Sequence, residues 1–217
     1  MLTKTIRATG WTLISVGVLI LLYLVYLLFF TNLETDRAQR DLLEQWSLEV
    51  GEAALPGEGF DPSAIDAESD PVDPGDAYAV IWFERPGSDV RPVRQEPLYV
   101  VEGVSLEVLK RGPGHYPETS APGGSGNFAI SGHRTTYGAP FYDLDDLRAG
   151  DRVHVVDRQG REFVYEVREQ RVVSPFDTWV VGRDPLGDGK PLMTLTTCHP
   201  RLSAAQRLIV FAELVTT

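Results

Sequence analysis

Three separated segments of the chain carry side chains suited to covalent catalysis. Cys198 is the only cysteine, and it directly follows residues 194–197, which read TLTT. His133 follows an apolar run that predicts a strand at residues 127–131, and Arg207 opens a third apolar run. A thiolate is an effective nucleophile, an imidazole transfers protons near neutral pH, and a guanidinium stabilises an oxyanion. Together these side chains make Cys198 a candidate nucleophile, His133 its candidate partner and Arg207 a candidate oxyanion group.

Strand geometry indicates which histidine can act as the catalytic partner of Cys198. Alternate residues of an extended strand share a face, so Cys198 is expected to point away from Thr197 and His199. His199 is therefore not the expected partner, although it is adjacent in sequence. His133 is the better candidate, because it begins a loop where the ends of distant strands converge. None of the three residues alone establishes a catalytic role. Most single cysteines, for example, are small buried hydrophobic residues.

Arg207 opens a predicted strand that is apolar on both faces. Alternation places Ile209 and Phe211 on the same face as Arg207, and Leu208 and Val210 on the other. A guanidinium entering a strand buried on both sides needs an anionic partner or a functional reason. The oxyanion of a transition state is one such reason, and a structural ion pair is the alternative.

An uncharged segment near the N-terminus, residues 8–33, predicts a membrane anchor. Its almost entirely apolar run at residues 11–30 has the length of about 20 residues that crosses the hydrocarbon core as a helix. Basic residues precede the segment and acidic residues follow it, so the N-terminus is predicted to be cytoplasmic and the remainder extracellular. The alternatives are a buried core helix and a cleaved signal peptide. The length of the run and the lack of an A-x-A-like site favour a single uncleaved anchor in the cell membrane.

Composition divides the chain into three predicted parts. Residues 1–33 form a cytoplasmic stub and the transmembrane anchor, and residues 34–75 form a juxtamembrane helix and an acidic linker rich in Pro and Gly. Residues 76–217 form the catalytic domain, with many short β-like runs between turn residues. The domain is therefore predicted to be mostly β, as a closed barrel or a sandwich. The juxtamembrane helix is predicted at residues 37–50, strands at 78–83, 97–101, 127–131, 152–156, 163–173, 192–197 and 207–215, and short helical patches at 105–109 and 140–147.

Charge and cysteine count exclude several classes of function. The net charge of −11 argues against nucleic acid, because phosphate binding needs clustered Lys and Arg. One cysteine allows no internal disulfide, and no Cys/His or HExxH spacing predicts a metal site, so no cofactor is expected. Outside the cytoplasm an unpaired thiol is liable to oxidation, which favours a reactive role for it.

These residues resemble the sortase family of cysteine transpeptidases. The signature of the family is a Thr-Leu-x-Thr-Cys strand end, an upstream His after a strand, and an Arg shortly after the Cys. Here residues 194–198, His133 and Arg207 carry it, and the resemblance covers roughly residues 76–217. Four sequence segments are similar to class E sortases, the housekeeping type of high-GC Gram-positive bacteria. These segments read GHYP at 114–117, GHRTTYGAPF at 132–141, TLTTCHP at 194–200 and SAAQRLIVFAEL at 203–214.

The resemblance implies an eight-stranded sortase β-barrel with Cys198, His133 and Arg207 as catalytic residues. It implies cleavage of a C-terminal sorting signal, LPxTG or LAxTG, between Thr and Gly, and class E is associated with the Ala form. The implied acceptor is an amine of a peptidoglycan precursor. Tyr116, Thr196 and Thr197 are further expected to line the peptide groove, and His115 and His154 are expected to be structural or surface residues.

Three other functions stay open at this point. A pilin-polymerising sortase and a plain cysteine peptidase would share the fold and the cysteine. A membrane-tethered binding module with an inert barrel would not need a reactive thiol. Reactivity of Cys198 toward alkylating reagents separates the enzymes from the module, because a structural cysteine reacts slowly.

Overall fold

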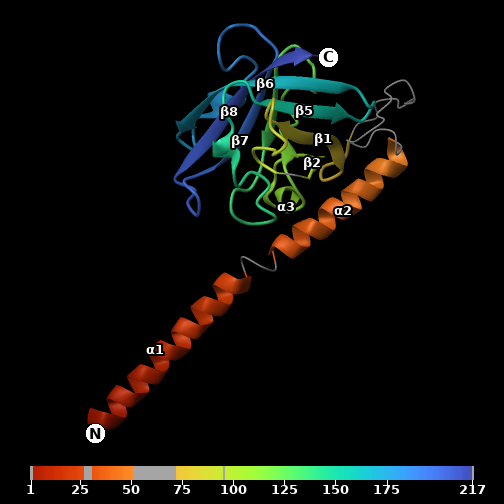
Figure 1. Cartoon of the computed structure of the whole chain (residues 1–217). Coiled ribbons are helices and arrows are strands. Elements are labelled where there is room, and N and C mark those ends of the chain that lie inside the picture. The colour runs from red at the N-terminus through yellow and green to blue at the C-terminus, as the bar shows by residue number, and fades with distance from the viewer. Residues whose placement is uncertain (1, 27–30, 51–71, 95, 217) are drawn as a thin grey trace.

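The computed structural model describes residues 2–26, 31–50, 72–94 and 96–216 (Figure 1). Most of the predicted acidic linker, residues 51–71, lies outside these ranges. Two long helices, α1 (Leu2–Val25) and α2 (Thr31–Glu49), precede a domain of eight strands. The remaining elements are β1 (Ala77–Glu84), β2 (Leu98–Glu102), α3 (Leu106–Leu109), β3 (Gly114–His115), β4 (Asn127–Ser131), η4 (Leu144–Asp146), β5 (Arg152–Asp157), β6 (Glu162–Val173), η5 (Thr178–Val181), β7 (Leu192–His199) and β8 (Gln206–Thr216).

The strands form a closed barrel in the order β1-β2-β3-β4-β7-β8-β6-β5. This confirms the predicted eight-stranded barrel with short helices. Closure leaves no free sheet edge, which is how a domain of short strands protects its backbone groups. Two neighbouring pairs, β2 with β3 and β4 with β7, are parallel, and the other pairs are antiparallel. The parallel β4–β7 pair brings together segments that are 60 or more residues apart in sequence, and it becomes the floor of the candidate site.

Strand alternation explains how the barrel fills its interior. On β4, Phe128 and Ile130 point inward, and on β7, Met193 and Leu195 do the same. Each of these four side chains is at most 1% exposed. The residues between them face outward, and on β4 and β7 that outward face is covered in part by η5. The pattern of buried residues therefore fixes which side chains remain on the outside of the barrel.

Helix α2 packs along one side of the barrel (Figure 1). It begins at Thr31, not at Arg37 as the sequence pattern predicted, because its first turn contacts loops of the barrel. The Gln39 side chain accepts a hydrogen bond from Tyr99 N–H at 2.9 Å and donates to the Tyr99 carbonyl at 3.0 Å. Leu42 and Trp46 are fully buried against β1 and β2. The helix is therefore part of the folded domain.

Replacement of Trp46 by Ala is expected to destabilise the protein by roughly 3–5 kcal/mol, because it leaves a large cavity between α2 and the barrel. Trp46 is 0% exposed, whereas Leu48 on the same helix is 80% exposed. Leu48→Ala is the matched control and should change stability by less than about 0.5 kcal/mol. Chemical denaturation measures both variants. Equal effects would show that α2 does not pack on the barrel.

Helix α1 stands away from the barrel in Figure 1. Within the described ranges, no helix meets the combined length and hydropathy needed to span a membrane.

Candidate functional site

Cys198 lies at the end of β7, on the outer face of the barrel. Thr194, four residues earlier on the same face, donates from Oγ1 to Asn127 Oδ1 of β4 at 2.8 Å. Its Oγ1 also lies 3.1 Å from the Val180 carbonyl of η5. Cys198 itself is partly exposed, unlike the residues before it on β7. The strand thus presents the thiol at the surface from a rigid support.

Arg207 lies directly opposite Cys198 in the antiparallel β7–β8 pair. Residues paired across two strands share a face, so both side chains lie on the outside of the barrel. Arg207 Nη1 donates to the carbonyls of Ala204 and Gln206, both at 3.0 Å. Among the described residues these hydrogen-bond partners are neutral, which leaves the positive charge available to an anion. Beyond Arg207 the strand is buried, from Leu208 to Ala212, as its pattern predicted.

His133 lies in the loop just beyond the end of β4. The parallel pairing sets Ser131 opposite Thr196, and the ladder continues with Gly132 N–H donating to the Thr196 carbonyl at 3.1 Å. His133 and Cys198 each follow this pair by two residues, His133 beyond the end of β4 and Cys198 within β7. Gly132 is needed at the turn, because a Cβ there would meet the ring of Phe141 at 2.6 Å. The structure therefore pairs Cys198 with Arg207 and places His133 in the loop that begins where the β4–β7 pairing ends.

The environment of His133 favours its neutral form. Burial lowers the pKa of the imidazole below its ordinary value. Within the described part of the chain, His133 Nε2 is buried without a hydrogen-bond partner. The ring lies 4.9 Å from that of Tyr137, centroid to centroid. Buried polar atoms are usually hydrogen-bonded in proteins, so this nitrogen is a candidate hydrogen-bonding group of the site.

Arg134 forms a support behind the site that sequence reasoning missed. It is only 2% exposed, and its Nη2 pairs with Asp145 Oδ2 at 2.7 Å. Its Nη1 lies 3.3 Å from the Cys198 carbonyl and 3.0 Å from His199 Nδ1. An arginine has no acceptor, so His199 Nδ1 accepts this bond. His199 thus serves to fasten the loop, in agreement with the prediction that it does not partner Cys198.

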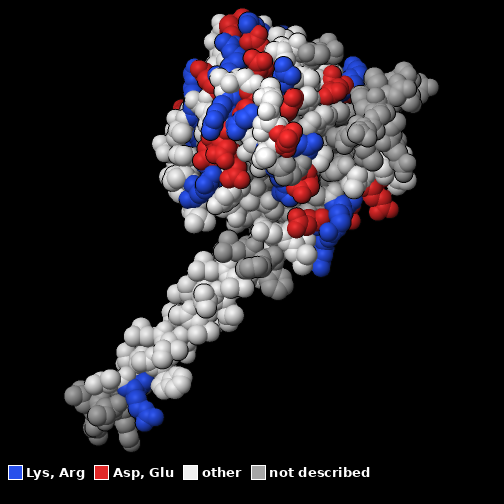
Figure 2. Space-filling view, in the orientation of Figure 1, with Lys and Arg blue, Asp and Glu red and all other residues white. Residues whose placement is uncertain are grey.

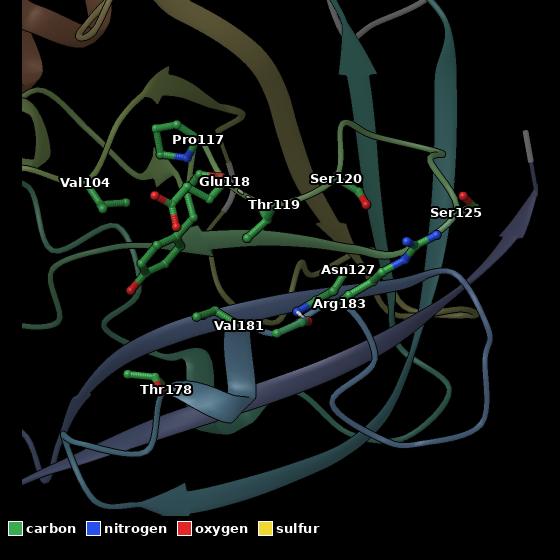
Figure 3. A pocket seen from close by; sticks show the side chains of 12 residues that line it. Val104, Pro117, Glu118, Thr119, Ser120, Ser125, Asn127, Thr178, Val181 and Arg183 are labelled. Carbon is green, nitrogen blue, oxygen red and sulfur yellow. Dashed lines mark hydrogen bonds between the residues drawn. The ribbon is translucent and has the colours of Figure 1, made fainter.

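A cleft of about 890 Å³ runs along the outer face of β4, between residues 116–120 and η5. Its lining includes Tyr116, Thr119, Asn127, Thr178, Val181 and Arg183. In Figure 3, Thr178 lies toward one end of the cleft and Arg183 toward the other. Cys198 is not among the lining residues. Of the β4 residues, Asn127 at the start of the strand lines the cleft, whereas Ser131 at its end pairs with Thr196, two residues before the thiol.

Residues 92–215 match a protein family described as the sortase domain. The chain belongs to the sortase family. Members of this family are cysteine transpeptidases, which fits the thiol at the end of β7. The membership confirms the family resemblance seen in the sequence.

The most similar relatives include E-type sortases of Streptomyces. Sortase SrtE1 of Streptomyces coelicolor is 32% identical over 96% of this chain, which spans 57% of that relative's length. Sortase SrtE2 of the same organism is 28% identical over 99% of this chain and 83% of its own. The solved sortase E of Streptomyces avermitilis superposes with a TM-score of 0.56 at 37% identity, covering 66% of this chain and 91% of that chain.

The structure places the three predicted groove residues, Tyr116, Thr196 and Thr197, in different environments. Tyr116 lines the cleft, where its backbone N–H donates to the Ala129 carbonyl at 3.0 Å. Thr196 shares the outer face with Cys198 but is only 4% exposed. Thr197 is turned to the other face, is 2% exposed, and donates from Oγ1 to the Gly132 carbonyl at 2.7 Å. Thr197 therefore holds the turn before His133, and its contact with substrate stays a prediction.

The two remaining histidines of the sortase domain have carboxylate partners. His115 is 3% exposed, pairs through Nδ1 with Glu102 Oε2 at 2.7 Å, and stacks on Tyr78 with centroids 4.2 Å apart. His154 lies on the outside of β5, between Glu84 and Glu162 at 2.7 and 2.8 Å. Both are structural or surface residues, as predicted.

The lowered pKa of His133 predicts how stability depends on pH. The unfolded chain binds a proton at this histidine near its ordinary pKa of about 6.5, and the folded protein does so only at lower pH. Stability from this group is therefore complete above about pH 6.5 and decreases as the pH falls toward and through the folded pKa. Melting temperatures of the wild type and His133→Gln between pH 7.5 and 4.5 test this, with the wild type losing more. Parallel curves would contradict it.

Proposed function

We propose that this chain is a membrane-anchored cysteine transpeptidase. It cleaves a C-terminal sorting signal of the LAxTG or LPxTG type between Thr and Gly, and it joins the surface protein to an amine of a peptidoglycan precursor. The observation that supports the proposal is that Cys198 and Arg207 are paired across β7 and β8, while His133 follows the β4 residues that pair with the strand of Cys198. Similarity to the E-type sortases favours the Ala form of the signal.

The proposed reaction passes through a thioester on Cys198. The thiolate attacks the threonine carbonyl carbon, and the bond to the glycine nitrogen breaks while imidazolium His133 gives its proton to the leaving amine. The incoming amine then attacks the thioester, loses a proton to neutral His133, and releases the thiolate. Arg207 stabilises the oxyanion formed in each step. Burial lowers the pKa of His133, so its protonated form is a stronger acid toward the leaving amine.

The cleft along β4 is proposed as the site for the signal residues that precede the scissile bond. It has Tyr116 in its wall, and Cys198 is not among its lining residues. Asn127 holds the opposite wall in place, because its Nδ2 donates to the carbonyls of Val180 and Gly182 at 3.2 and 3.0 Å. A peptide whose threonine carbonyl reaches Cys198 would place its earlier residues in this cleft.

The N-terminal segment is proposed as a single-pass anchor with the catalytic domain outside the cell. Residues 8–33 carry no charge, and the large apolar side chains described on α1 are 41–67% exposed. In Figure 2 the helix is white along most of its length, with blue atoms only near its N-terminal end. Apolar side chains exposed around a whole helix are expected where lipid covers them.

The test uses the full chain in detergent with quenched fluorescent peptides that carry LAxTG or LPxTG. Cleavage between Thr and Gly with formation of a threonine–amine product would support a transpeptidase, and the preferred peptide would identify the signal. Hydrolysis without transfer to any amine would favour a peptidase, and transfer only to a pilin lysine would favour a polymerising sortase. No cleavage together with a Cys198 thiol inert to alkylation would favour a tethered binding module.

A further inference from the structure

The loop that follows His133 has an unusual backbone. Tyr137, Gly138 and Ala139 are consecutive and all have positive φ, at 51°, 70° and 43°. Such left-handed conformations disfavour residues that carry a Cβ. Non-glycine residues keep them only where surrounding contacts hold the backbone in place. The contacts that hold this loop therefore also position the residues that pack against it.

The first turn of α2 supplies those contacts. Asn32 Oδ1 accepts a hydrogen bond from Gly138 N–H at 3.0 Å, and Thr31 Oγ1 accepts one from Tyr137 N–H at 3.4 Å. Thr35 packs so closely that a Cβ on Gly138 would lie 2.9 Å from its Cγ2. Thr35 also donates to a carbonyl of the neighbouring barrel loop at 2.7 Å. The first turn of α2 thus holds the left-handed loop in place from outside the barrel.

The left-handed loop contacts His133 in two places. The ring of Tyr137 lies against the His133 ring, with centroids 4.9 Å apart. The loop closes with Phe141 N–H donating to the His133 carbonyl at 3.1 Å. On its other side, Tyr137 has Lys110 Nζ 5.9 Å from its ring centroid. A displacement of the loop would therefore move the ring that packs against His133.

We propose that the first turn of α2 is a positioning element for His133, acting through the Tyr137–Gly138 backbone. This inference rests on the proposed function of His133 as the acid and base of the reaction. Only residues 26–30 separate α1 from α2 in the sequence. The proposed anchor is therefore joined to the helix that holds the histidine loop, and the catalytic domain needs this helix for full activity as well as for attachment.

The test compares single variants of the full chain in detergent. Asn32→Ala removes the acceptor for Gly138 N–H, Asn32→Asp keeps an acceptor, and Gln45→Ala is the matched control. Gln45 Oε1 accepts Ala77 N–H at 3.4 Å, so the control breaks a similar bond at the other end of α2. Asn32→Ala should lower kcat about 5- to 10-fold with little change in KM, the effect expected from losing one net hydrogen bond. Asn32→Asp should restore kcat, and Gln45→Ala should leave it within about 2-fold.

A second measurement does not depend on substrate. The His133 ring signals are titrated by NMR and assigned with His133→Gln. In Asn32→Ala the loosened loop should admit water, and the pKa of His133 should rise toward its ordinary value. Gly138→Ala, which pushes the loop from Thr35, should do the same. If neither variant shifts this pKa, or if Gln45→Ala shifts it equally, the inference is overturned. Failure of the wild type to process any sorting peptide would overturn the proposed function, while the titration would still decide the role of α2.

Discussion

Cys198→Ala is expected to abolish transpeptidation, because no thioester can form without the thiol. The remaining groups do not replace it. In the proposed mechanism Arg207 stabilises charge and His133 transfers protons, and neither forms the thioester. The loss should appear in kcat, whereas binding of the sorting peptide should persist, since the cleft along β4 does not include Cys198. Single-turnover assays with mass detection of the acyl-enzyme measure this.

The control for Cys198→Ala is the stability of the fold. Cys198 is partly exposed at a strand end, so its removal should change the melting temperature little. Iodoacetamide should label the wild type at this residue and leave the variant unlabelled. Turnover near the wild-type rate in a stably folded Cys198→Ala protein would rule out the proposed mechanism.

Arg207→Ala is expected to lower kcat by about 10²–10³, the usual effect of removing one oxyanion donor. The guanidinium is held by two carbonyls of the β7–β8 turn and lies opposite Cys198. Lysine should restore little, because its single ammonium cannot bond both carbonyls and still present a donor in the same plane. Steady-state kinetics of Arg207→Ala and Arg207→Lys measure the effect.

Arg171→Ala is the matched control for Arg207→Ala. It makes the same charge change on the outside of the barrel, at a partly exposed arginine of β6 that pairs with Glu169 at 2.5 Å. Its kcat should remain within about 2-fold of the wild type, since exposed ion pairs contribute little. Equal losses in both arginine variants would mean that net charge, and not the position of Arg207, matters.

Much of the fold follows from the alternation of apolar residues. The predicted strand at 127–131 coincides with β4, and the seven predicted strands all correspond to observed ones. The same alternation separated Cys198 from His199, and the Arg134 contact of His199 agrees with it. Alternation works here because the inward side chains of a barrel must be apolar, so the pattern is visible in the sequence. The two-residue strand β3 was missed, since it is too short to show any alternation.

The start of α2 at Thr31 was also missed, for a related reason. Its first turn is fixed by contacts with Tyr137 and Gly138, which are distant in sequence and leave no periodic signal. The support from Arg134 and the hydrogen bond from Thr197 to the Gly132 carbonyl belong to the same group. Each depends on which atoms lie nearby in space, and a sequence pattern carries no such information.

From the sequence alone came the prediction of the catalytic residues, of the strand ends where they lie and of the faces they occupy. The parallel pairing of β4 with β7, after which His133 and Cys198 follow by two residues each, and the pairing of Cys198 with Arg207 became visible only in the folded chain. The tertiary structure also decided the burial that lowers the pKa of His133 and leaves its Nε2 without a partner among the described residues. The physical reason is that chemistry and periodicity are local properties of the chain. Strand order, burial and the electrostatic environment arise only when segments far apart in the sequence pack together.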